Sequence, residues 1–369
     1  MIRNILTLLL SLSLSVINNM AYSLPANINN DIVASALPVY SPRFDRSKPI
    51  VAIVGENTYT ELTDYIIPYG ILSESKVADV FALATQDGAL QMFPALRLQP
   101  QTTTSKFDLN FPRGADYVIV PAVHHSDDPD LIKWIVEQAS KGSTIIGVCD
   151  GVLVLANAGL LAEHKAVGHW YSLDNLKDEF PRTEWVKNTR YIADKKIVTT
   201  TGVTASIPVS LALVEAISGT KRANEVGQAL GIDDWGVKHQ SDEFKLSAKH
   251  LWVAASNWLA FWSKEKIGIP ITEGVNEVTL ALTADSYSRT YRSQAYSISE
   301  SPLGVVSKHG LTILPDDIQA KSSFSHIIEL RDDIKAGLIL DAVLTDIKVR
   351  YGVDTARFVA LQLEYSARL

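Results

Sequence analysis

The only cysteine of the chain, Cys149, stands where a predicted strand passes directly into a predicted helix. The apolar run 143–148 before it is typical of a buried strand, and residues 150–158 after it have the apolar pattern of a helix. A sharp turn of this kind presents a nucleophile at the edge of a sheet. We expect the helix dipole to lower the pKa of the thiol and favour the reactive thiolate. The alternative is a buried core cysteine, a common environment for this residue type.

The two residues after Cys149 indicate how such a site would be built. The backbone N–H of Asp150 is expected to point toward the sulfur and to stabilise a developing oxyanion. The carboxylate of Asp150 would raise the pKa of the thiol if it pointed inward, so we expect it to cap the helix instead. Gly151 removes a side chain where two backbone segments must pack closely.

His124 and His125, followed by acidic residues, have the residue types of a metal site. Adjacent residues on an extended backbone point to opposite faces, and Asp128 is expected to cap a helix over residues 131–141. The sequence therefore predicts no metal here, although either histidine could line the mouth of the Cys149 pocket.

Composition limits the remaining classes of function. The chain has 369 residues, enough for about two domains. With 34 Lys and Arg against 41 Asp and Glu, its net charge of -7 is unlike that of a nucleic-acid-binding protein. A single cysteine excludes an internal disulfide and a cysteine-rich metal site.

The N-terminus has the pattern of an export signal. Arg3 supplies a positive charge, residues 5–17 are apolar, and residues 21–23 fit a small-residue cleavage site. The alternative is a permanent membrane anchor, for which the apolar run is short. We therefore expect a periplasmic or secreted protein with no membrane span once the signal has been cleaved.

The middle of the chain alternates apolar strands with helices. This order predicts a mostly parallel sheet with helices on both faces, and so an α/β fold. Residues 91–98 are expected to form a further extended piece. The predicted strands are 49–55, 77–85, 115–121, 143–148 and 196–201, and the predicted helices are 61–72, 131–141, 150–158 and 206–218.

The composition changes after residue 219. Residues 220–268 have a helical pattern and four tryptophans, which we interpret as packing surfaces: Trp235, Trp252, Trp258 and Trp262. The segment 278–283 is strand-like, and residues 275–281 faintly resemble residues 77–83. The last helical patterns cover residues 327–351 and 355–366. The predicted organisation is a signal peptide (1–23), an extended lead-in (24–47), an α/β domain (48–219), a helical connector (220–274) and a smaller α/β C-terminal region (275–369).

Several ordered motifs extend the pattern around Cys149: 147–151, 155–161 and 166–170, supported by Phe180-Pro181, Trp185, Arg190-Tyr191 and residues 200–205. Together they resemble the DJ-1/PfpI (ThiJ/PfpI) superfamily, which is related to the class I glutamine amidotransferases. The resemblance covers about residues 48–219 and is nearest to the isonitrile hydratases and the amidotransferase-like domains of AraC-type regulators. It implies a flavodoxin-like three-layer sandwich.

The resemblance also implies roles for particular residues. Cys149 matches the nucleophile, Asp64 the acidic residue near the thiol, and His169, followed by Trp170, the expected base. The alternatives are a solvated acid for Asp64 and a core histidine for His169. Gly151, Trp170, His124 and His125 are the predicted pocket residues.

The chain departs from the family pattern at two places. Ala122 and Val123 stand where the family usually has Gly-Gly, and Asp150 follows the cysteine. The oxyanion would then be held by the backbone amides of Asp150 and Val123, with the Val123 side chain narrowing the site. The C-terminus lacks the basic recognition helix of the AraC-type relatives.

The sequence thus predicts an exported cysteine-dependent hydrolase or hydratase for a small carbon–nitrogen substrate. It would need no cofactor, would not bind nucleic acid, and could form a homodimer. The alternative is a non-catalytic periplasmic protein that senses redox conditions or binds a ligand or partner through a reactive Cys149.

Overall fold

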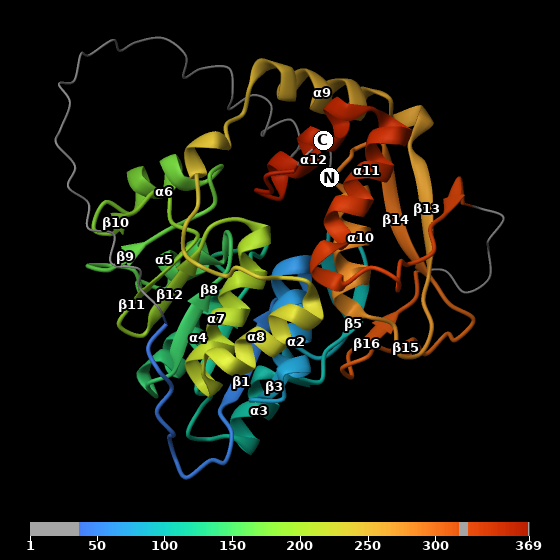
Figure 1. Cartoon of the computed structure of the whole chain (residues 1–369). Helices are drawn as coiled ribbons and strands as arrows, with labels where there is room; N and C mark the ends of the chain where they lie inside the picture. Colours follow the sequence, from blue (N-terminus) through green and yellow to red (C-terminus); the bar gives the residue numbers. More distant parts are fainter. Residues whose placement is uncertain (1–36, 317–323, 368) are drawn as a thin grey trace, which may run out of the picture. The chain divides into compact units, whose positions relative to one another are not determined.

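The structure is a computed structural model that describes residues 37–316, 324–367 and 369 (Figure 1). These residues form one compact unit. The predicted signal peptide and the first part of the lead-in lie outside the described residues, so both stay predictions. No helix in the described part of the chain is long and apolar enough to cross a bilayer.

A seven-stranded sheet forms the centre, in the order β11-β12-β8-β7-β1-β3-β6. All neighbouring strands are parallel except β11 and β12. The predicted mostly parallel sheet is therefore confirmed. Its strands are β1 (Ile50–Gly55), β3 (Asp79–Ala84), β6 (Thr102–Thr103), β7 (Tyr117–Val120), β8 (Thr144–Gly147), β11 (Tyr191–Asp194) and β12 (Ile197–Thr200).

Two hydrophobic cores lie on opposite faces of this sheet. Along β1, Val51 and Ile53 belong to one core while Ile50, Ala52 and Val54 belong to the other, as the period of a strand requires. Together the two helical layers and the sheet make the three-layer sandwich that the sequence predicted. The first core holds α2 (Leu62–Ser75), α7 (Ser206–Ser218) and α8 (Thr220–Leu230), and the second holds α3 (Thr104–Asn110), α4 (Pro129–Ser140), α5 (Gly151–Asn157) and α6 (Leu173–Glu179).

The remaining strands form three small sheets. The five-stranded sheet joins distant parts of the chain, because β16 pairs antiparallel with β5 through Thr312 and Gln99. Its members are β2 (Thr58–Glu61), β4 (Leu90–Phe93), β5 (Arg97–Gln99), β15 (Val305–Val306) and β16 (Thr312–Leu314). The others are β13 (Glu265–Pro270), β14 (Ser293–Ile298) and β17 (His326–Ile327), and the pair β9 (Lys165–Ala166) and β10 (Glu184–Trp185).

We extend the C-terminal region from the predicted residues 275–369 to residues 265–369, so that it includes β13. Its helix α10 (Glu277–Ser288) packs against α2, and the two are among the most extensively contacting helices (Figure 1). The later helices of the chain are α9 (Ala248–Leu259), α10 (Glu277–Ser288), α11 (Ile339–Tyr351) and α12 (Val353–Gln362), with short 3-10 turns at Val203–Ala205, Ser241–Glu243, Phe261–Ser263 and Ala336–Leu338.

The predicted strand at 278–283 is wrong, because these residues lie within the helix α10. Every residue of α10 is buried, so no polar face marks its helical period and the apolar run looks like a strand. Asn276 begins the helix by accepting hydrogen bonds from the backbone of Val278 and Thr279. The proposed similarity between residues 275–281 and 77–83 is therefore also wrong, because most of the first segment lies in the helix α10 and most of the second lies in the strand β3.

Three further expectations need correction. Residues 265–270 are the strand β13, and the predicted helix over 327–351 begins only at Ile339. Trp235 packs against the core as expected. Three tryptophans of α9 and the turn after it bury less of their surface than a packing role predicts, with exposed fractions of 73% for Trp252, 42% for Trp258 and 77% for Trp262.

Candidate active site

Cys149 occupies the predicted elbow between β8 and α5. Its φ of 54° lies in the left-handed region, as a nucleophile on a sharp strand-to-helix turn requires. The backbone N–H of Cys149 donates to Thr200 Oγ1 on β12 at 3.2 Å. A Cβ atom at Gly151 would lie 2.0 Å from the carbonyl oxygen of Val120, so only glycine fits after the turn. The expected close backbone approach at Gly151 is confirmed.

The environment of the thiol differs from the predicted one. Cys149 is only 6% exposed and lies within a hydrophobic core. Burial, followed by the negative charges of Asp64, Asp150 and Glu61, raises the pKa of the thiol well above 9.0, although the Asp150 backbone N–H opposes this shift. The prediction of a lowered thiol pKa was wrong, because the dipole of a seven-residue helix does not offset burial and neighbouring carboxylates. The thiol therefore rests in its protonated form.

Asp64 lies close enough to act on the sulfur, from the first turn of α2. It is fully buried, its Oδ2 accepts a hydrogen bond from the Ala122 backbone N–H at 3.2 Å, and its Oδ1 has no hydrogen-bond partner. Burial and the charge of Glu61 raise the pKa of Asp64 well above 3.8. Asp64 is therefore a buried acid near the thiol that holds its proton more tightly than an ordinary aspartate, not a solvated surface acid.

Asp150 does not cap α5 as predicted, since its side chain makes no capping hydrogen bond. Its Oδ2 instead accepts a hydrogen bond from the Ser172 hydroxyl at 2.8 Å, which turns the carboxylate toward the 169–172 segment. Its Oδ1 is buried without a partner. The negative charge of Asp150 consequently contributes to the raised pKa of Cys149.

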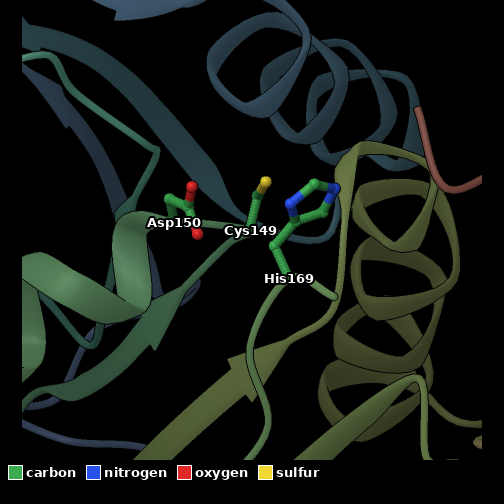
Figure 2. A group of neighbouring side chains, drawn as sticks. All are labelled: Cys149, Asp150 and His169. Carbon is green, nitrogen blue, oxygen red and sulfur yellow. The ribbon is translucent and has the colours of Figure 1, made fainter. Parts of the chain in front are cut away.

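His169 completes the group around the sulfur. Figure 2 shows Cys149 between Asp150 and His169, with one ring nitrogen of His169 on the side of the sulfur. One donor atom from each residue lies within 4.8 Å of the other two, an arrangement that could exchange a proton or hold a metal ion. His169 is 8% exposed, and its ring lies 5.3 Å from that of Trp170. The expectation that the site uses no metal stays a prediction.

The other predicted pocket residues have mixed positions. Trp170 donates its indole N–H to the Leu361 carbonyl at 3.1 Å. Val123 is half-buried and forms an isolated bridge with Thr60. Its backbone amide as an oxyanion donor stays a prediction.

His124 and His125 do not point to opposite faces, because the chain bends there rather than running extended. The Asp128 N–H donates to the His125 carbonyl, and the two rings lie 5.2 Å apart, edge to face. His125 contacts Glu56 at 3.4 Å and His124 contacts the ring of Tyr59. Their place at the mouth of the Cys149 pocket is untested.

Sequence reasoning missed a buried charge network beside Asp64. Glu61 caps α2 by accepting from the Asp64 backbone N–H at 2.6 Å, and its other oxygen accepts from Arg289 Nη2 at 2.7 Å. Arg289 follows α10, and its Nε also donates to Asp285 at 2.8 Å. The guanidinium is close enough to Cys149 to interact with it electrostatically. A separation of 228 residues between Arg289 and Glu61 hides this pair from any local motif.

Sequence reasoning also missed Glu364, which follows α12. Its side chain is 1% exposed and accepts hydrogen bonds from the Gly202 backbone N–H at 2.6 Å and from His239 at 2.7 Å. Its Oε2 lies 4.0 Å from His169 Nε2. Glu364 has a left-handed φ of 53°, which is unusual for a residue other than glycine. The sequence gives no sign of this conformation.

Comparison with known proteins agrees with this architecture. The DJ-1/PfpI family model matches residues 49–216. An isonitrile hydratase from Pseudomonas putida is 28% identical over 165 residues, which cover 43% of this chain and 68% of the hydratase. The HTH-type transcriptional regulator CdhR from Pseudomonas aeruginosa is 32% identical over 100 residues, which cover 27% of this chain and only 30% of the regulator.

Solved structures of the same family are also similar. Drosophila melanogaster DJ-1beta is 16% identical, with a TM-score of 0.46 over 51% of this chain and all of that protein. A ThiJ/PfpI family protein from Pseudomonas syringae is 19% identical, with a TM-score of 0.46 over 58% of this chain and 83% of that protein. From the family match and the topology of the central sheet, residues 49–216 of this chain form a DJ-1/PfpI family domain.

Proposed function

We propose that this protein is a cysteine-dependent hydratase or hydrolase that acts at Cys149 on a small carbon–nitrogen substrate, with an isonitrile as the best candidate. The observation that carries the proposal is the placement of His169 within reach of the Cys149 sulfur on its strained elbow, with the buried acid Asp64 near enough for its charge to act on the thiol. Similarity to an isonitrile hydratase over 43% of the chain supports it. The low exposure of Cys149 favours a small, uncharged substrate.

The buried acid Asp64 favours an isonitrile over an amide. Amide hydrolysis develops charge on an oxygen and depends on backbone N–H groups aimed at it. The Ala122 N–H donates to Asp64, which leaves the Asp150 and Val123 amides for that role. Addition to an isonitrile requires a proton for the terminal carbon, and a buried carboxyl with a raised pKa such as Asp64 can supply one.

The proposed reaction has two steps that balance. In the first, the Cys149 sulfur bonds to the isonitrile carbon, Asp64 protonates that carbon, and the thiol proton passes to His169, giving a thioimidate on the enzyme. In the second, the oxygen of a water molecule bonds to the same carbon and one of the water protons goes to the nitrogen. The carbon–sulfur bond then breaks as the carbon–oxygen double bond forms, the remaining water proton passes to the sulfur, and His169 returns its proton to Asp64. The product is an N-substituted formamide, and the thiol and both proton carriers return to their starting states.

Turnover of isonitriles tests the proposal directly. The purified protein should convert small alkyl isonitriles to formamides, detected by mass spectrometry, and Cys149→Ala should lower kcat/KM by a factor of about 1,000 or more. Asp64→Asn, which keeps the shape but not the acid, should lower it by about 100-fold. Equal turnover by wild type and Cys149→Ala would remove Cys149 from the mechanism. If amides assayed alongside the isonitriles are hydrolysed and no isonitrile is turned over, the substrate class is amides and not isonitriles.

The raised thiol pKa gives a second test. Because alkylation needs the thiolate, the rate of Cys149 modification by iodoacetamide should still be rising above pH 9.0. A rate that levels off near neutral pH would show a low-pKa thiol. That result would favour the redox-sensing alternative, since susceptibility to oxidation follows thiolate character.

We also propose that the protein is exported to the periplasm or secreted, as the N-terminal sequence pattern indicates. The mass of the mature protein, recovered from a host that recognises the signal, tests this. Loss of about the first 23 residues supports export, whereas a full-length mass in the cytoplasm contradicts it. A homodimer remains a prediction, to be checked by light scattering.

A further inference from the structure

Two buried charged groups of the C-terminal region lie beside the residues that surround Cys149, although they are outside the family match. Arg289 reaches Glu61 from the end of α10, and Glu364 lies next to His169 from the end of α12. We propose that the C-terminal region completes the Cys149 site within the same chain, with Arg289 and Glu364 as positioning residues that act through Glu61 and His169. The effect on turnover rests on the proposed function, but the effect on thiol reactivity does not.

Arg289 fixes the acidic side of the site. Its side chain is 12% exposed and that of Glu61 is 7% exposed, so their 2.7 Å ion pair is largely shielded from water. Breaking such a pair leaves an uncompensated buried charge, which the surrounding structure cannot tolerate without rearranging. Glu61 would then lose the position from which it caps α2 and holds the Asp64 backbone. The conformation of the acid beside Cys149 therefore depends on a residue 228 positions away.

Asp285 strengthens this dependence. Asp285 is fully buried and accepts a hydrogen bond from Arg289 Nε. Because Arg289 Nη2 also donates to Glu61, the guanidinium is held in one orientation by two carboxyl groups. Burial raises the pKa of Asp285, although Arg289 opposes the shift. The positive charge of Arg289 also acts on the sulfur itself, where it favours the thiolate against the three nearby carboxyl groups.

Glu364 lies behind the basic side of the site. The ring nitrogen of His169 that faces the sulfur in Figure 2 is on the opposite side of the ring from Nε2, which lies 4.0 Å from Glu364 Oε2. The two groups do not form a hydrogen bond at this distance, and Nε2 has no hydrogen-bond partner among the described residues. A buried carboxylate this close still stabilises the positive charge that develops when the ring accepts a proton. The Gly202 N–H and His239 hold Glu364 in that place.

Gly202 lies in close contact with both Glu364 and His169. A Cβ at Gly202 would lie 2.6 Å from Glu364 Oε2 and 2.7 Å from His169 Cδ2. Neighbouring bonds fasten the same segment, because Trp170 donates to the Leu361 carbonyl and Thr204 donates through its hydroxyl to the Glu364 carbonyl. The end of α12 is thus attached both to the loop that carries His169 and to the segment 202–204 that follows β12.

The single cysteine makes the test specific, because the alkylation that is lost in Cys149→Ala reports on Cys149 alone. We would measure the rate of iodoacetamide modification of the full-length protein across a pH series, by intact mass. Glu364→Gln keeps the size of the side chain and an acceptor for the Gly202 N–H but removes the charge. We expect its rate at neutral pH to fall by about fivefold or more, with the pH profile displaced toward higher pH. Glu329→Gln, an exposed residue of the same region, is the matched control and should behave as wild type.

Arg289→Lys supplies the second arm. Lysine keeps the positive charge but cannot hold Glu61 and Asp285 together, so thiol reactivity should be intermediate, whereas Arg289→Met should lower it further or prevent folding. Arg331→Lys, whose partner Asp333 is exposed, is the control. Circular dichroism confirms which variants are folded.

The outcomes separate the two proposals. If folded Glu364→Gln and Arg289→Lys keep the wild-type rate and pH profile, the C-terminal region does not complete the site and the inference is wrong. If both displace the profile while no isonitrile or amide is turned over by the wild type, the inference stands and the proposed function fails. Where turnover exists, both variants should lower kcat more than they raise KM, as expected for residues that position proton carriers rather than bind substrate.

Discussion

The family domain, residues 49–216, and the C-terminal region contribute to the Cys149 site in different ways. The domain places the sulfur by local backbone geometry, through a left-handed turn and a glycine that packs against the neighbouring strand. The C-terminal region contributes charge over a long separation in sequence, through Arg289 and Glu364. The position of a nucleophile can thus be encoded in a few consecutive residues, whereas its electrostatic environment depends on how the whole chain packs.

The largest expected effect tests the local half of this comparison. Gly151→Ala would bring a Cβ within 2.0 Å of the Val120 carbonyl, which is backbone and cannot rotate away. We expect the free energy of unfolding to fall by about 3 kcal/mol, at the upper end for overpacking, and Cys149 to be displaced. Chemical denaturation measures the first and turnover the second.

Gly159→Ala is the matched control. Gly159 also has a left-handed φ, of 73°, but a Cβ there would meet no atom within 4 Å. Its cost should be only the conformational one, about 1 kcal/mol. If the two variants were equally stable, the elbow would not depend on the close approach of α5 to β7.

A smaller effect tests how the two regions are joined. The side chain of His309 contacts the buried Glu277 of α10, and its Nε2 forms a hydrogen bond of 2.7 Å with Glu74 Oε2 of α2. Burial lowers the pKa of His309, but the hydrogen bonds and charges of Glu277 and Glu74 prevail and raise it above 6.5. Because the folded-state pKa is the higher one, this stabilisation is complete below about pH 6.5 and is lost as the pH rises through the raised value.

The free energy of unfolding of the wild type should therefore decrease between mildly acidic and alkaline pH through this group. His309→Gln should lower stability at acidic pH and flatten the pH dependence. Urea denaturation at several pH values measures both. An unchanged slope in the variant would mean that the link between α2 and α10 does not rest on a charged His309.

The same contrast explains what the sequence could predict. The strands β1, β3, β7, β8 and β12, the helices α2, α4, α5 and α7 and the elbow at Cys149 follow from apolar runs and small-residue turns, which are local signals. The short helices α3 and α6 were not predicted. The thiol pKa was predicted in the wrong direction because its largest cause, burial, depends on how the whole chain packs, and because the Asp150 carboxylate was expected to cap α5. The contribution of Glu61 was missed because this residue lies far from Cys149 in the sequence. The strand expected at 278–283 failed because α10 is buried on every side, so its pattern does not alternate.

The smallest expected effect concerns α9, which lies between the two regions in sequence. Trp252 is 73% exposed, so Trp252→Gln removes little buried area and should change the free energy of unfolding by less than about 0.5 kcal/mol. Trp170→Phe, in contrast, loses the hydrogen bond that joins the family domain to the Leu361 carbonyl of α12, although the Glu364 N–H still donates to that carbonyl. The loss of this one hydrogen bond should cost about 1 kcal/mol and also lower thiol reactivity. A Trp252 variant as destabilised as the Trp170 variant would show that α9 is covered in solution and that its tryptophans belong to an interface.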